Sequence, residues 1–315
     1  MKLTPGQADT ISPEAKLAIE ATDISVLRTA EWTEDSIKVS REEEKRLNTP
    51  VVRQIADKFA RDVRNTSFGG VPVVVVTPKR LKPEYKDTAA VYVHGGGFIM
   101  GTAFDCYSSL MADALGMPVY SIEYQLSPEA KYPVAVDETI SAYQDISSRL
   151  GAHRTVAFGV SAGGNILPSA LLKARDKGLA LPAATAMFTP WTDLTGAGDT
   201  YEGNDGRDIL FWENQLDRAA ADYVGNADRR DPLVSPAYAD FRGFPPTIIT
   251  AGTRDLFLSN CVRLYWSLRA ASVQAELLIW EGMMHGFNVD PVLPEAQKAR
   301  AEAARFLTTY LTQKE

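Results

Sequence analysis

Short runs of β-branched and apolar residues, bounded by glycine or proline and each followed by a helical stretch, begin near Gly70 and continue almost to the end of the chain. This repetition is typical of βα units, which place parallel strands side by side and pack helices against the sheet. The run Thr247-Ile248-Ile249-Thr250-Ala251 is apolar without alternation, as expected when helices cover both faces. We therefore predict an α/β fold with one mostly parallel central sheet flanked by helices. The predicted strands are 71–77, 89–93, 119–124, 155–159, 184–188, 247–251 and 276–280.

Three segments outside this repetition have their own predicted structure. Residues 1–65 are predicted to be helical and polar, with Ser12 as an N-cap and Pro13 at the first helical position. The charged run 41–46 within them is predicted to be a solvated helix face. Residues 190–244 are rich in Asp, Gly and aromatic residues, and we predict that they carry their own helices and form part of a lid. A closing helix is expected from Pro294 to Thr312.

The charge balance disfavours several classes of partner. Across 315 residues, 33 Lys and Arg stand against 40 Asp and Glu, which gives a formal net charge of −7. Without a basic cluster the chain is not expected to bind nucleic acid, anionic membranes or acidic substrates. Cys106 and Cys261 show neither a disulfide framework nor zinc-type spacing. No apolar run is long enough for a membrane span or a signal peptide, so a cytoplasmic location is expected.

The sequence Gly159-Val160-Ser161-Ala162-Gly163-Gly164 follows a predicted strand directly and opens a predicted helix. A sharp strand-to-helix turn needs small residues around a serine, and it exposes the serine hydroxyl at a helix N-terminus. Ser161 is therefore the candidate nucleophile. The alternative is a glycine-rich turn that only links strand to helix.

The sequence His94-Gly95-Gly96-Gly97-Phe98 follows another predicted strand. Consecutive glycines let the backbone approach a ligand and direct N–H groups at a developing oxyanion. We predict that the N–H groups of Gly96, Gly97 and Ala162 form an oxyanion hole, while His94 braces the loop. A phosphate-binding loop is disfavoured because Met100 occupies the position of a required glycine. A plain tight turn is the remaining alternative.

A nucleophilic serine needs a base, and the chain contains three histidines: His94, His153 and His285. His153 precedes a predicted strand and is expected at the surface. His285 follows the last predicted strand, at the sheet edge where open parallel sheets bind ligands. Asp255 follows the preceding strand and is the candidate acid that orients the base. Asp193, which also follows a strand, is the alternative acid.

These motifs together resemble the α/β-hydrolase fold, and within it the hormone-sensitive-lipase-like esterases of bacteria. The resemblance covers the chain from about Val71 to its end, and a softer resemblance points to ε-lactone hydrolases. It implies that residues 1–65 form an N-terminal helical cap segment and that 190–244 contribute a second cap segment to a catalytic domain of 66–315. A homodimer is expected from the family's habit of pairing through edge strands. The matching residues are 94–98, 159–164, 231–236, Asp255 and 282–287.

Three features depart from this family. Val160 stands where an aspartate commonly precedes the serine, and Pro168 is expected to kink the following helix or shift its start. Leu256-Phe257-Leu258 replace an acidic continuation after Asp255. None of these changes removes a catalytic group.

The predicted function is hydrolysis of short- to medium-chain acyl esters or of lactones, through an acyl-enzyme on the serine. No metal or organic cofactor is expected. A non-catalytic ligand-binding protein on the same fold is the alternative, and amide hydrolysis is a third reading. Aromatic candidates for the wall of the acyl pocket are Trp32, Trp191, Phe211 and Trp212.

Overall fold

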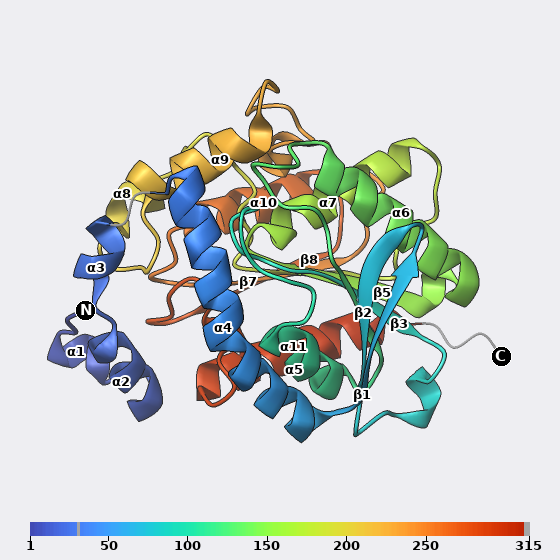
Figure 1. The fold of residues 1–315 in the computed structure, drawn as a ribbon, viewed down its shortest axis with the longest axis horizontal. Coiled ribbons are helices and arrows are strands. Elements are labelled where there is room, and N and C mark those ends of the chain that lie inside the picture. Colours follow the sequence, from blue (N-terminus) through green and yellow to red (C-terminus); the bar gives the residue numbers. More distant parts are fainter. Residues whose placement is uncertain (30–31, 312–315) are drawn as a thin grey trace.

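An eight-stranded sheet crosses the middle of the molecule, in the strand order β1-β2-β4-β3-β5-β6-β7-β8 (Figure 1). It is seen in a computed structural model that describes residues 1–29 and 32–311. Strand β2 runs antiparallel to β1 and β4, and the remaining neighbours are all parallel. The predicted α/β fold with a mostly parallel sheet is therefore confirmed. The strands are β1 (Ala60–Phe68), β2 (Val71–Pro78), β3 (Ala89–Val93), β4 (Val119–Ile122), β5 (Thr155–Val160), β6 (Thr185–Phe188), β7 (Thr247–Gly252) and β8 (Ala275–Trp280).

Both faces of the sheet are buried under helices. In β3, Ala89, Val91 and Val93 pack into one hydrophobic cluster, while Ala90 and Tyr92 pack into another on the opposite face. This explains why the central strands are apolar without alternation. Helices α5 and α11 cover one face, and α6, α7 and α10 cover the other (Figure 1). Their bounds are α5 (Cys106–Leu115), α6 (Val134–Leu150), α7 (Gly163–Asp176), α10 (Leu258–Ala270) and α11 (Pro294–Thr309).

Strand β1 corrects the prediction that residues 1–65 are helical throughout. The helix before it ends at Phe59, and the strand begins at Ala60. Strand β1 lies at the edge of the sheet and is exposed along most of its length, and among the described strands it pairs with β2 alone. Because only its two ends, Ala60 and Phe68, pack against the core, its sequence shows neither an apolar run nor apolar alternation, so periodicity could not reveal it.

Two segments pack against each other beside the sheet. The first comprises α1 (Pro5–Ala8), α2 (Pro13–Ala21), α3 (Ile24–Thr29) and α4 (Glu34–Phe59). Residues 190–244 form the second, and they do carry helices of their own, α8 (Thr200–Gly203) and α9 (Asp217–Val224). The N–H of Trp32 donates to the carbonyl of Asn214 at 3.2 Å. Arg28 forms an ion pair with Asp205 at 2.8 Å.

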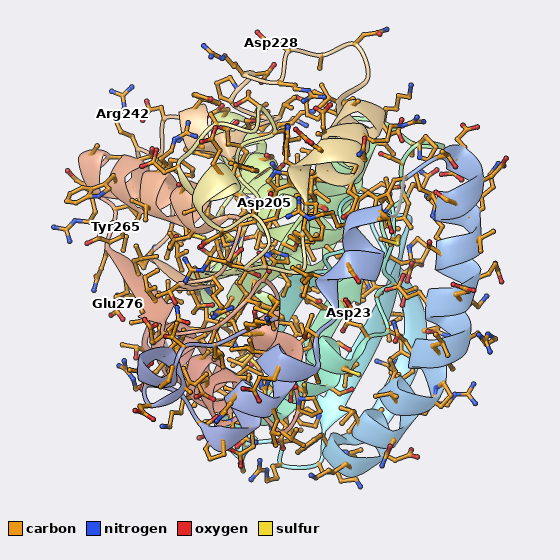
Figure 2. All side chains as sticks on the ribbon, turned by 90° about the vertical axis from the view of Figure 1, so that its left-hand side faces the viewer. Asp23, Asp205, Asp228, Arg242, Tyr265 and Glu276 are labelled. Atoms are coloured by element: carbon orange, nitrogen blue, oxygen red, sulfur yellow. The ribbon has the colours of Figure 1, made fainter. Side chains whose placement is uncertain are left out.

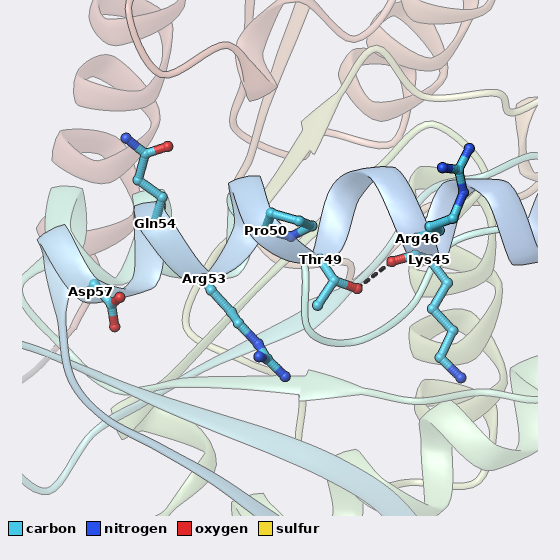
Figure 3. A pocket seen from close by; sticks show the side chains of 7 residues that line it. All are labelled: Lys45, Arg46, Thr49, Pro50, Arg53, Gln54 and Asp57. Atoms are coloured by element: carbon cyan, nitrogen blue, oxygen red, sulfur yellow. Dashed lines mark hydrogen bonds between the residues drawn. The ribbon is translucent and has the colours of Figure 1, made fainter.

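The charged run in α4 is only partly solvated, which corrects the prediction for residues 41–46. Lys45 and Arg46 are exposed and project from the helix (Figure 3). Arg41 instead donates to the carbonyl of Ile99 at 2.6 Å, and the Glu44 carboxylate accepts the N–H of Gly101 at 3.2 Å. These contacts tie α4 to the loop that follows β3.

The closing helix starts at Pro294, as predicted, and ends at Thr309. The predicted end at Thr312 lies outside the described residues. Within residues 1–29 and 32–311, no helix combines the length and the apolar character that a bilayer crossing would need.

Candidate active site

Ser161 occupies the sharp turn between β5 and α7. Its backbone is left-handed, with φ at +55°. The Ser161 N–H donates to the carbonyl of Phe188 at 2.9 Å, and its own carbonyl accepts from Gly164 at 2.9 Å and Trp191 at 3.1 Å. Such a conformation is uncommon in a residue with a side chain, and it persists where the surroundings fix it. Here hydrogen bonds on both sides of Ser161 hold the turn.

Glycines let the loop after β3 lie directly against this turn. A Cβ atom added to Gly163 would lie 2.0 Å from the carbonyl oxygen of Val93, which is the last residue of β3. A Cβ atom on Gly95 would lie 3.2 Å from the Cβ of Ser161. Side chains at these positions would push the loop away from the serine.

The structure brings Ser161, His285 and Asp255 together, although they are far apart in sequence. The His285 Nε2 lies 2.9 Å from the Ser161 Oγ, and its Nδ1 lies 3.1 Å from the Asp255 Oδ1. Asp255 is fully buried, whereas Ser161 and His285 each keep 9% of their surface exposed. With Nδ1–H donating to the carboxylate, Nε2 is free to accept the serine proton.

The charges around His285 favour its protonated form. Burial alone would lower the pKa of His285, but the charge of Asp255, the hydrogen bond to Asp255 and the charge of Asp208 outweigh it, so the pKa is raised. A raised pKa makes the imidazole a stronger proton acceptor once it is neutral.

The predicted oxyanion donors lie on the two segments that meet at Ser161: Gly96 and Gly97 in the loop after β3, and Ala162 directly after the serine. In the described part of the chain, the N–H groups of Gly96, Gly97 and Ala162 donate no hydrogen bond to another backbone or side-chain group. Gly96 and Gly97 have φ angles of +107° and +62°, which favour glycine. Ala162 precedes α7, whose N-terminus adds positive potential. These N–H groups are available to an anionic oxygen.

His94 stabilises the same loop. Its ring stacks on Tyr124 with centroids 4.1 Å apart, and its Nδ1 lies 2.8 Å from the carbonyl oxygen of Gly95. Burial lowers the pKa of His94 to about 4, against the smaller effect of the hydrogen bond to Gly95, so the ring is neutral at pH 7. The Tyr124 hydroxyl donates to the carbonyl of His94 at 3.0 Å.

The alternative acid and the other histidine lie elsewhere. Asp193 forms an ion pair with Arg263 and accepts the Tyr238 hydroxyl at 2.9 Å, so its carboxylate is already engaged. His153 is exposed in a short 3-10 helix before β5.

The departures from the family pattern leave this geometry in place. Helix α7 begins at Gly163 and runs through Pro168 to Asp176, so the start of the helix is not shifted. Phe257 presents its ring edge-on to His285 at 4.9 Å and stacks on Trp191 at 5.1 Å.

The four aromatic candidates lie at different depths. Trp191 and Phe211 are buried. Trp212 is half-buried and packs edge-on against Trp191 and Tyr201. Trp32 lies 3.8 Å from the position of a Cβ on Gly97, which places it beside one of the predicted oxyanion donors.

No sequence pattern assigned a role at this site to Asp208, Arg41 or Glu44. Asp208 is fully buried within residues 190–244 and bonds to the backbone of His285. No local motif surrounds it, and only a three-dimensional structure reveals its partner 77 residues away.

Two hollows lie apart from the serine. One, of about 650 Å³, is bordered only by residues of α4, among them Lys45, Arg46 and Arg53 (Figure 3). The other, of about 200 Å³, lies between α2 and the loop after β8, and Met284 and Gly286 on either side of His285 line it.

Residues 90–289 match the family described as the alpha/beta hydrolase fold. The chain belongs to this family. This α/β hydrolase is 32% identical to an acetyl-hydrolase of Streptomyces hygroscopicus over 80% of its own length and 89% of the relative. It is 26% identical to an esterase of Acinetobacter venetianus, covering 88% of its own length and 95% of the relative.

Solved structures agree with this assignment. The α/β hydrolase superposes on the crystal structure of an esterase, E25, with a TM-score of 0.92 and 30% identity, over 99% of this chain and 98% of that one. An esterase from the bacterial hormone-sensitive lipase family matches with a TM-score of 0.81 and 27% identity, over 96% and 99% of the two chains. The predicted family is confirmed, and the chain is a carboxylesterase-like serine hydrolase of the hormone-sensitive-lipase type.

Proposed function

We propose that this enzyme hydrolyses carboxylic esters through an acyl-enzyme formed on Ser161. The 2.9 Å contact between the Ser161 Oγ and the His285 Nε2 carries the proposal, because it joins a nucleophile to a base with raised pKa. Asp255 holds the base through the 3.1 Å contact to Nδ1. A ligand-binding protein without catalysis would not need this constellation.

In the first half of the reaction, the Ser161 Oγ attacks the ester carbonyl carbon while His285 takes the hydroxyl proton. The negative charge that develops on the carbonyl oxygen is stabilised by the N–H groups of Gly96, Gly97 and Ala162. Each such donor contributes about 3 kcal/mol in comparable enzymes. His285 then gives its proton to the departing alcohol. Water repeats the sequence to release the acid.

The proposed substrates are short- to medium-chain acyl esters or lactones. Similarity to proteins named acetyl-hydrolase and acetyl esterase supports small acyl groups. The proximity of Trp32 to Gly97 supports an aromatic wall close to the acyl carbon. A lactone is an ester closed into a ring, so the same steps would open it.

We also propose that residues 1–65 and 190–244 act as two cap segments on a catalytic domain of 66–315. The boundary between residues 65 and 66 falls inside strand β1. Support comes from contacts on one glycine of the oxyanion loop. Trp32 from the first segment and Ala219 from the second lie 3.8 and 4.0 Å from the position of a Cβ on Gly97.

The test compares wild-type protein with Ser161→Ala on p-nitrophenyl butyrate, ε-caprolactone and an aminoacyl anilide at equal concentrations. We expect turnover of the ester or the lactone by wild type and a loss of at least 1000-fold in the variant. A series of p-nitrophenyl esters of increasing acyl length then defines the chain-length limit. Absence of turnover in wild type, activity that survives the substitution, or preference for the anilide would contradict the proposal.

A further inference from the structure

A second buried carboxyl group, that of Asp208, lies beside the proposed base and acid, and the proposed mechanism does not use it. Asp208 belongs to residues 190–244 and has no exposed surface. Its Oδ1 accepts the N–H of His285 at 3.0 Å and the N–H of Ile209 at 2.7 Å. Its Oδ2 accepts the N–H of Leu256 at 2.5 Å. One carboxyl group thus receives hydrogen bonds from three backbone donors.

These contacts connect the two loops that carry the base and the acid. His285 lies in the loop after β8, and Leu256 follows Asp255 in the loop after β7. The Asp208 carboxylate bridges them through hydrogen bonds from both backbones. A bridge of this kind fixes how far apart the imidazole and the Asp255 carboxylate lie.

Asp255 has few direct restraints on its own side chain. Its Oδ1 accepts the N–H of Phe257 at 2.9 Å and lies against His285, whereas its Oδ2 has no partner within the described residues. A second residue of the 190–244 segment also holds this loop. The Asn204 side chain donates to the carbonyls of Asp255 at 2.9 Å and Thr253 at 3.2 Å.

We propose that Asp208 is a positioning residue for ester hydrolysis: its carboxyl group, supplied by residues 190–244, locks the Asp255 and His285 loops together and places a second negative charge beside the imidazole. The proposal rests on the function proposed above. It extends that function by making residues 190–244 part of the machinery that aligns the base.

The charged groups around the base are few. Asp255 and Asp208 act on His285, and both favour the imidazolium. Tyr201 and Cys261 face Asp255 from α8 and α10, and burial raises the pKa of each, so both stay neutral at pH 7. Burial and the charge of Asp255 raise the pKa of Asp208, whereas the charge of His285 and the N–H groups of Leu256 and His285 oppose this rise and favour the carboxylate.

These contacts predict in which direction the pKa of His285 moves when Asp208 is replaced. Removing the Asp208 charge withdraws one group that raises the pKa of His285, so the base should lose its proton at lower pH. An asparagine at this position would also turn an amide N–H₂ toward a backbone N–H, because only one of its two terminal atoms accepts hydrogen bonds. The loops would then lose part of the bridge.

The experiment measures kcat and KM on p-nitrophenyl butyrate from pH 5 to 9 for wild type, Asp208→Asn and Asp208→Glu. The matched control is Asp205→Asn, which removes an exposed carboxylate of the same segment that pairs with Arg28 (Figure 2). For Asp208→Asn we expect kcat to fall about 10- to 100-fold, because small displacements of catalytic groups cost that much. KM should stay within about twofold, and the acid limb of kcat/KM should move to lower pH.

Asp208→Glu keeps the charge but displaces it by one methylene, so the acid limb should stay near its wild-type position while kcat remains lowered. Asp205→Asn should match wild type in both. If folded Asp208→Asn keeps wild-type kcat, or loses kcat without any movement of the acid limb, the inference is wrong. If Asp208→Asn does not fold, wild-type kcat in Asp208→Glu would overturn it. Ser161-dependent turnover by wild type is measured first, so failure of the proposed function is recognised separately.

Discussion

The proposed nucleophile, Ser161, is held as much by its backbone hydrogen bonds as by its side-chain contacts. Ser161 adopts a left-handed conformation that its neighbours stabilise with hydrogen bonds to its N–H and its carbonyl. His285 is held similarly, since its N–H is bound by Asp208 and its ring contacts Phe257 edge-on. Hydrogen bonds and packing therefore hold the proposed nucleophile and base in place, and a preorganised site of this kind is what electrostatic stabilisation of a transition state requires.

The raised pKa of His285 predicts the pH dependence of activity. A general base works only when neutral, and its folded pKa lies above the ordinary value of about 6.5. The value of kcat/KM should therefore fall as the pH falls, with a midpoint above 6.5. A pH-stat assay on a non-ionisable ester measures this profile. A midpoint clearly below 6.5 would contradict the assignment of His285.

Mutation should distinguish the two candidate acids, Asp255 and Asp193, by their effect on kcat. Asp255→Asn should lower kcat by about 10⁴-fold, as expected when the base loses its orienting carboxylate. Asp193→Asn should keep kcat within a few-fold, because this side chain contacts Arg263 and Tyr238 instead of His285. It should lower the free energy of unfolding by about 1–3 kcal/mol, since it weakens a buried hydrogen-bonded group. Measurements of kcat and of urea unfolding for Asp255→Asn and Asp193→Asn test these expectations. A large loss of kcat in Asp193→Asn together with a small loss in Asp255→Asn would identify Asp193 as the acid.

At the scale of elements, the site depends on close approach between β3, β5 and α7. The turn after β5 fits against the end of β3 only because Gly163 has no side chain. The loop after β3 is in turn tied to α4 through Arg41 and Glu44. A helix from the first 60 residues thereby contacts the loop that carries two of the proposed oxyanion donors, Gly96 and Gly97.

Replacing Gly163 in this turn should push the start of α7 away from the end of β3. In Gly163→Ala the added Cβ would lie 2.0 Å from the Val93 carbonyl oxygen, so the backbone must shift. We expect a loss of about 3 kcal/mol or more in the free energy of unfolding and at least 100-fold in kcat. Gly203→Ala is the control, because within the described residues no atom beyond its own helix backbone and its chain neighbours lies within 4 Å of the added Cβ. That control should be neutral or stabilise the protein by about 0.4–1 kcal/mol. Equal effects in the two variants would refute this account.

The sequence was informative where a residue's role is set by its neighbours in the chain. The central strands were predictable because helices bury both of their faces, and Ser161 because an elbow needs small flanking residues. Strand β1 was not, since an edge strand has no buried face to leave a pattern. The contacts of Arg41 and Asp208 were not predictable, because their partners lie 58 and 77 residues away in the sequence and no local motif marks either residue.

At the scale of the whole molecule, the sheet ends in two unpaired edges, β1 and β8. Strand β1 is rich in charged and polar residues, whereas β8 exposes Ile279 to 40%. Helix α10, which packs on β8, exposes Val262 and Trp266. An open strand beside exposed apolar groups favours association with another chain. We therefore predict that the expected homodimer forms through strand β8.

We expect wild-type protein to sediment as a dimer at micromolar concentration and Ile279→Lys to sediment as a monomer, because a charge on an edge strand opposes pairing. Val63→Lys, on the opposite edge strand β1, is the control and should leave the dimer intact. Val63 is exposed to a similar extent, 38%. A monomeric wild type, or dissociation by the β1 variant alone, would show that β8 is not the interface.

The bridge formed by Asp208 also constrains how this scaffold can be redesigned. Grafting another enzyme's residues 190–244 to change acyl preference would remove Asp208 and Asn204, and with them the hydrogen bonds that hold the loops on which His285 and Asp255 are mounted. Selectivity and turnover would then change together. A chimera that retains these two side chains separates the two properties, so recombination of this segment should preserve positions 204 and 208 and vary the residues around them.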